Sequence, residues 1–95
     1  MYVRITTGNF DPAKEAELQQ LTDEKYIPLI QQLPGFHSYL GSIDSVAGRA
    51  LAITVWDSLE HEQAALQAIG GLAGEIEAAS LRLDPTQIFA VMRQL

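Results

Sequence analysis

The chain has 95 residues, a formal net charge of -6 at pH 7 and no cysteine. This length fits one domain, and 47% hydrophobic residues are more than so small a core can enclose. Only 6 residues are lysine or arginine, which argues against a nucleic-acid partner, and the absence of cysteine excludes disulfides, thiol nucleophiles and thiolate metal sites. We therefore expect a second copy of the chain to cover part of the apolar surface.

The first residues lack the charged start, apolar run and small-residue cleavage site of a signal peptide. No apolar run in the sequence approaches the length that a membrane-spanning helix needs. We therefore expect a cytoplasmic protein with no membrane partner.

Residues 2–7 alternate between two faces and are rich in β-branched side chains, which predicts a first strand. Asp11-Pro12 then begins a helix, because the carboxylate can cap free N–H groups and proline fits the first helical position. The apolar spacing extends this helix to about Leu33, and Pro28 should bend its last turns.

A hairpin is predicted next, with strands over residues 36–44 and 49–56 and a turn over 45–48. The second of these strands is apolar on both faces. This pattern indicates a sheet that is covered on both sides.

The second helix begins directly after Trp56. Asp57 is the expected N-cap, with Glu60 in the capping-box position, although Ser58 could cap equally well. Glycines at 70, 71 and 74 should break this helix, and residues 87–93 supply a fourth strand.

The predicted order is β-α-β-β-α-β, which is typical of the ferredoxin-like α+β fold with an antiparallel four-stranded sheet and both helices on one face. The other face of the sheet is apolar as well and needs a cover. Two subunits that place these faces together would form a homodimer with the helices outside.

Three stretches give the chain a resemblance to the antibiotic biosynthesis monooxygenase family. They are LPGF at 33–36 after a long helix that contains Ile27-Pro28-Leu29, the hairpin, and ITVWDSLEHEQA at 53–64. The resemblance covers nearly the whole chain and implies a single domain of this family over residues 1–95, folded as a dimeric α+β barrel. It also implies oxidation of small aromatic or quinol-type molecules by oxygen, without a bound cofactor, in a cavity between sheet and helices.

Within this resemblance, Trp56 is similar in place to the Trp at the end of the third strand of the family. Ala52 and Glu62 stand near the places of an Asn and a Tyr that work with that Trp. A second branch, the haem-degrading monooxygenases, combines this Trp with an Asn after the first strand and an axial His. Asn9 matches that Asn, but His61 comes too early to match the haem ligand.

The candidate catalytic residues are His37, Trp56 and Asn9. His37 is the candidate proton acceptor, because imidazole titrates near neutral pH, and Trp56 and Asn9 are candidate donors to a developing oxyanion. Core packing is the structural interpretation of Trp56, and a polar strand end that of His37. A ligand pocket is predicted to include Tyr26, Tyr39, His61, Phe89 and Met92.

Two functional hypotheses follow from the sequence. The first is a homodimeric, cofactor-independent oxygenase that binds a small apolar or aromatic molecule. The second is a non-catalytic dimer that binds a small molecule or serves as an accessory subunit, since fold alone does not establish catalysis. No metal site is expected, because neither histidine has a ligand partner at a suitable spacing.

Overall fold

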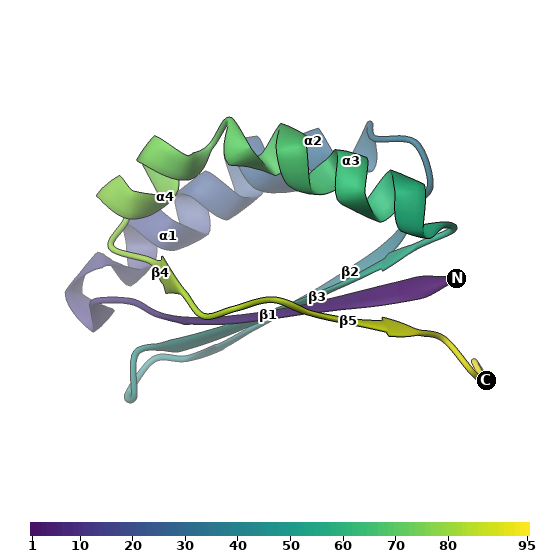
Figure 1. The fold of residues 1–95 in the computed structure, drawn as a ribbon. Helices are drawn as coiled ribbons and strands as arrows, with labels where there is room; N and C mark the ends of the chain where they lie inside the picture. The colour runs from purple at the N-terminus through teal and green to yellow at the C-terminus, as the bar shows by residue number, and fades with distance from the viewer.

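The computed structural model of residues 1–95 is an antiparallel sheet with all of its helices on one face (Figure 1). The strands are β1 (Tyr2–Asn9), β2 (Phe36–Asp44), β3 (Arg49–Trp56), β4 (Arg82–Leu83) and β5 (Gln87–Ala90). The α-helices are α1 (Glu15–Leu21), α2 (Ile27–Gln31), α3 (Leu59–Gly70) and α4 (Ala73–Ala78). The α+β fold class predicted from the sequence is confirmed.

The strands lie in the order β2-β3-β1-β4, and β5 also pairs with β1. β5 and β4 occupy successive positions along one edge of β1, since Val3 pairs with Phe89 and Gly8 with Leu83. The predicted fourth strand is therefore present as β5, although it ends at Ala90. The two-residue strand β4 was not predicted, because so short a segment carries no periodic signal.

The predicted hairpin is confirmed with the same strand bounds. The carboxylate of Asp44 accepts hydrogen bonds from two backbone N–H groups of the turn, and Gly48 takes a φ of +67°. At the other end of β2 the register shifts between Phe36 and Ser38. His37 is the extra residue of this β-bulge and has no partner on β3.

The predicted first helix is three segments: a short 3-10 helix (Pro12–Lys14) with the Asp11 carboxylate at its start, then α1, and a π-helical stretch (Thr22–Tyr26) that leads into α2. In the π-helical stretch the Ile27 N–H bonds the carbonyl of Thr22, five residues back. Pro28 has no N–H and removes one α-helical hydrogen bond, which the wider π turn accommodates. The helix ends at Gln31 rather than Leu33.

The second predicted helix starts one residue later than expected with Asp57 as the N-cap, since α3 begins at Leu59. Asp57 is not the N-cap: the hydroxyl of Ser58 accepts the hydrogen bond from the His61 N–H, at 3.2 Å. Asp57 instead bonds the His61 side chain, with 2.6 Å between Oδ1 and Nδ1. The break predicted at the glycines is confirmed, since Gly71 ends α3 and α4 begins at Ala73. None of the helices is long and apolar enough to cross a membrane.

The interior between helices and sheet consists of two separate clusters of buried apolar side chains. One cluster is built on Trp56, which is fully buried, and the other on Phe10. The first contains Ile30, Trp56, Ala65 and Ile69, and the second contains Phe10, Leu18 and Ala79.

The opposite face of the sheet carries no helix (Figure 1). Register and alternation place one apolar side chain after another on this face, and Leu40 and Phe89 there are 58% and 52% exposed. We call this surface the open sheet face and define it by Val3, Ile5, Leu40, Ile53, Val55 and Phe89.

Because Gly48 lies in the tight hairpin turn, we expect substitution by alanine to affect stability differently at Gly48 and at Gly70. A Cβ at Gly48 would collide with the Phe10 carbonyl at a positive φ, whereas a Cβ at Gly70 would meet nothing within 4 Å. We expect Gly48→Ala to lower the free energy of unfolding by about 1–2 kcal/mol or more. Gly70→Ala, the matched control, should raise it by up to about 1 kcal/mol. Urea unfolding measures both, and equal effects of the two substitutions would show that the turn is not under this constraint.

Candidate functional site

A cavity of about 350 Å³ lies between the helices and the sheet. The cavity wall includes residues that belong to or pack against both core clusters. They are Tyr26, Tyr39 and Ile69 for the first cluster, and Leu18 and Leu21 for the second. The cavity therefore occupies the gap between the two halves of the core. Its volume falls within the range of small-molecule sites in proteins, roughly 300–1,000 Å³.

Small side chains on the helix-facing side of the sheet explain this gap. Gly8, Gly41, Ala50 and Ala52 all line the cavity and project little or nothing toward the helices. A Cβ at Gly41 would collide with the Tyr39 hydroxyl, so a larger residue there would require the Tyr39 ring to move. The sheet thus leaves space where bulkier residues would have closed it.

Three hydrogen-bonding side chains form a row across the sheet side of the cavity. Arg4 on β1 pairs with Thr54 on β3, and Thr54 pairs with Tyr39 on β2. All three line the cavity. A guanidinium and two hydroxyls can each donate a hydrogen bond, so this row suits a ligand oxygen that carries negative charge.

Arg4 is held by a buried acidic partner from the helix layer. Its Nε lies 3.6 Å from Oε1 of Glu62 on α3, and 8% of the Arg4 side chain and none of the Glu62 side chain is exposed. The separation makes an ion pair without a hydrogen bond, and Nε and both Glu62 oxygens have no hydrogen-bond partner.

Tyr26 and Tyr39 pack edge to face, with 5.6 Å between ring centres and 62° between ring planes. Burial raises the pKa of Tyr26 to about 12; Tyr39 adds to this rise and the charge of Arg4 opposes it. Burial, with a contribution from Asp23, also raises the pKa of Tyr39. Both phenols therefore keep their protons at neutral pH and can act as donors.

Trp56, a predicted catalytic residue, lies in the core beside the cavity and is not part of its wall. Its indole N–H donates to the Thr54 hydroxyl at 2.9 Å, and its ring packs edge to face on Phe36. Trp56 therefore contacts the cavity through Thr54, whose oxygen it orients.

The two histidines lie outside the cavity wall. His37 is exposed because the β-bulge at the start of β2 takes it out of the regular alternation. The ring of His61 bonds Asp57 near the start of α3, and this hydrogen bond is the main reason that the pKa of Asp57 is lowered. No group of three or more metal-ligating side chains is present.

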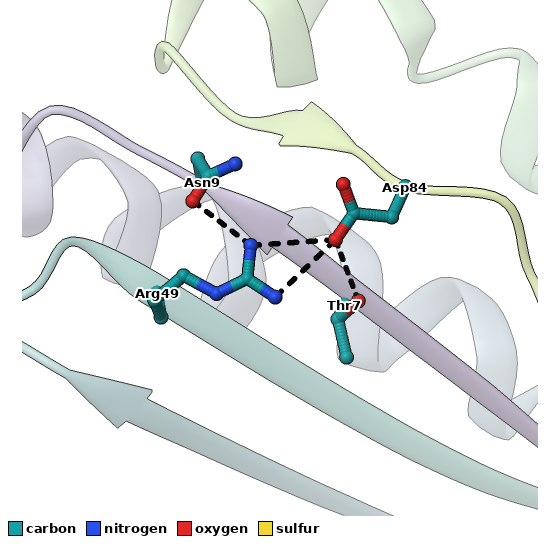
Figure 2. Close-up of polar contacts among 4 residues, drawn as sticks. All are labelled: Thr7, Asn9, Arg49 and Asp84. Atoms are coloured by element: carbon teal, nitrogen blue, oxygen red, sulfur yellow. Dashed lines mark hydrogen bonds and ion pairs between the residues drawn. The ribbon is translucent and has the colours of Figure 1, made fainter.

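Asn9 is not part of the cavity wall, and its side chain belongs to a polar cluster where β1, β3 and the segment after β4 meet (Figure 2). Arg49 donates to Oδ1 of Asn9 at 2.8 Å and to Oδ2 of Asp84 at 3.3 Å. Thr7 donates to the same Asp84 oxygen at 2.7 Å, which is the largest cause of the lowered pKa of Asp84. This cluster ties the C-terminal segment to the sheet and engages the side-chain oxygen of Asn9.

Of the five predicted pocket residues, Tyr26 and Tyr39 lie in the cavity wall. His61, Phe89 and Met92 do not. Phe89 lies on the open sheet face, and Met92 is exposed beyond β5. The structure adds three residues to the candidate site: Arg4, Thr54 and Glu62. In the sequence, each is only a charged or polar residue on a face that also carries apolar residues.

Solved structures of other proteins share this fold. A protein from Deinococcus radiodurans assigned as an antibiotic biosynthesis monooxygenase is 22% identical, with 100% of this chain and 96% of the other covered and a TM-score of 0.74. A dimeric ferredoxin-like protein from an uncultured marine organism is 15% identical, with coverage of 100% and 98% and a TM-score of 0.79. A variant of SnoaB from Streptomyces nogalater, a cofactor-independent oxygenase, is 18% identical, with coverage of 99% and 95% and a TM-score of 0.69.

No protein-family model matches the sequence, and no curated protein matches it either. The likenesses above confirm the predicted ferredoxin-like fold. They also place structures assigned as antibiotic biosynthesis monooxygenases among those that share it, as the sequence resemblance implied. At identities of this size the likeness concerns the fold alone.

The buried pair predicts a strong energetic coupling between Arg4 and Glu62. Arg4→Met or Glu62→Met alone leaves an uncompensated buried charge and should lower the free energy of unfolding by about 3–5 kcal/mol. The double variant removes both charges and should lose far less than the sum of the two. A double-mutant cycle by urea unfolding measures this coupling, and additive losses would mean that the two charges do not interact.

Proposed function

We propose that this chain is a homodimeric, cofactor-independent oxygenase of small aromatic, quinol-type molecules. The observation that carries the proposal is the cavity, which has an apolar wall and a row of donors from Arg4, Thr54 and Tyr39 on its sheet side. The fold that the chain shares with SnoaB, a cofactor-independent oxygenase, supports the same reaction class. A single domain over residues 1–95 and a cytoplasmic location are part of this proposal.

In such a reaction the substrate supplies the electrons. Removal of a proton from a phenol or an activated methylene group gives an enolate, and the donor row lowers the energy of its oxyanion. The enolate carbon then reacts with oxygen. For a methylene substrate the balance is CH2 plus O2 to C=O plus H2O, so one oxygen atom enters the product and the other leaves as water.

Asp23 is the acidic side chain of the cavity wall and our candidate for the proton acceptor. It belongs to the π-helical stretch, opposite the donor row on the sheet. The catalytic roles of His37 and Asn9 stay predictions, and both residues lie outside the cavity of a single chain. Trp56 would act by orienting the Thr54 hydroxyl.

The homodimer would form through the open sheet face. Its apolar side chains lie on one face of the sheet, and a dimeric ferredoxin-like protein shares the fold. Covering this face would also place both sides of the sheet away from water, as the apolar pattern of β3 requires.

A non-catalytic binding protein is the second candidate, and one observation favours it. Neither histidine, the side chain best suited to proton transfer at neutral pH, belongs to the cavity wall. The same observation argues against a haem-degrading enzyme, since the wall offers no axial imidazole.

Oxygen uptake tests the catalytic proposal. We expect consumption of oxygen with anthrones or naphthohydroquinones above the spontaneous rate, in protein treated with chelator and free of flavin. Tyr39→Phe removes one donor from the row and should lower kcat/KM by on the order of 10²-fold. Tyr2→Phe is the matched control, because Tyr2 does not line the cavity. Uptake at the spontaneous rate with all of these substrates would leave the binding-protein candidate.

Sedimentation velocity tests the dimer. We expect a dimer at micromolar concentration, and Leu40→Glu should convert it to a monomer by placing a charge in the covered interface. Val46→Glu is the control and should remain dimeric, because Val46 lies on the hairpin turn and is 95% exposed. A wild-type monomer would contradict the proposed interface.

A further inference from the structure

Arg4 is a nearly enclosed cation on the wall of an otherwise mainly apolar cavity. Removing a guanidinium from water is costly unless its charge is paired and its donors are hydrogen-bonded. Glu62 balances the charge but accepts no hydrogen bond from it.

The guanidinium has more donors than its protein surroundings use. It carries five N–H groups in a planar fork, and the contact with Glu62 is made at Nε. Nε is enclosed beside Glu62 without an acceptor, and the other four N–H groups make no hydrogen bond to the protein either. An anionic oxygen in the cavity would supply an acceptor of the kind that this fork binds best.

The surroundings of Arg4 fix where that oxygen would lie. Thr54 is the cross-strand neighbour of Arg4 on β3, and its hydroxyl oxygen already accepts the indole N–H of Trp56. The hydroxyl proton of Thr54 is therefore free to be donated to a ligand. Tyr39 follows on β2 and presents a protonated phenol. The other charged residue of the wall, Asp23, belongs to the helix layer and not to this row.

We infer that the cavity selects aromatic ligands that carry an ionised oxygen, a carboxylate or an enolate, and that Arg4, held in place by Glu62, binds this oxygen together with the Thr54 hydroxyl. The inference rests on the proposed function, because it assumes that this cavity holds the aromatic molecule. It narrows the substrate class from quinol-type molecules in general to their anionic members, and it makes Arg4 and Glu62 determinants of specificity.

Pairs of ligands that differ only in charge test this inference by binding, without turnover. Naphthoate and its neutral amide represent the carboxylate, and lawsone, a hydroxynaphthoquinone that is an anion at neutral pH, and its neutral methyl ether represent the enolate. Isothermal titration calorimetry gives each Kd. We expect the anion of at least one pair to bind about tenfold or more tightly than its neutral partner. The pair that shows this preference identifies which anion the site takes.

The double variant Arg4→Met/Glu62→Met, whose folding is checked by thermal melting, should bind both members of each pair equally. Arg93→Met is the control for a cation outside the cavity and should keep the preference of the wild type. Quenching of Trp56, the only tryptophan, reports binding next to the cavity.

Equal affinities within both pairs in the wild-type protein would overturn the inference, and this comparison depends on no variant. A preference that survives in the folded double variant would overturn it as well. Binding with the expected preference but no oxygen uptake would instead contradict the oxygenase proposal alone. Oxygen uptake with neutral quinols and no preference would contradict the anion site alone.

Discussion

The structure depends on the small side chains of the sheet face that meets the helices. Gly8, Gly41, Ala50 and Ala52 leave the space between the middle of the sheet and the helices unfilled, so the core divides into two clusters with a cavity between them. In a domain of this length such a gap lowers stability, since it forgoes apolar burial and close packing. The same gap provides a preformed cavity for a ligand, and Arg4, Thr54 and Tyr39 place hydrogen-bonding side chains in its wall.

Much of the fold follows from local signals in the sequence. The hairpin was predicted residue by residue, because a glycine turn between two β-rich runs fixes both ends at once. The start of α3 was less certain, because Asp57 and Ser58 are both good caps; in the structure Ser58 caps the helix and Asp57 bonds the His61 ring. The π-helical stretch before Pro28 depends on how the chain rearranges hydrogen bonds around a missing donor, which periodicity does not report.

The site was harder to predict, because its residues are brought together by register. In the sequence, Arg4 is a charged residue of an alternating strand and suggests a solvent-exposed face. Only the pairing with Thr54 and the contact with Glu62 show that it is buried. His37 was expected on the regular pleat, and a single bulge exposes it. Asn9 matched a family position, but Arg49 holds its amide on the other side of the sheet. Of the residues predicted for an apolar pocket, Tyr26 and Tyr39 line the cavity of a single chain and Phe89 and Met92 do not, because the sequence does not say which face of the sheet each aromatic side chain takes.

A crystal structure of the protein with lawsone is the most direct test of whether an aromatic anion occupies the space between the two core clusters. We expect the naphthoquinone ring between the helices and the sheet, with its ionised oxygen about 2.7–2.9 Å from a nitrogen of Arg4. A cavity closed by Tyr26 and Tyr39, or a ligand bound only on the open sheet face, would contradict the proposed site.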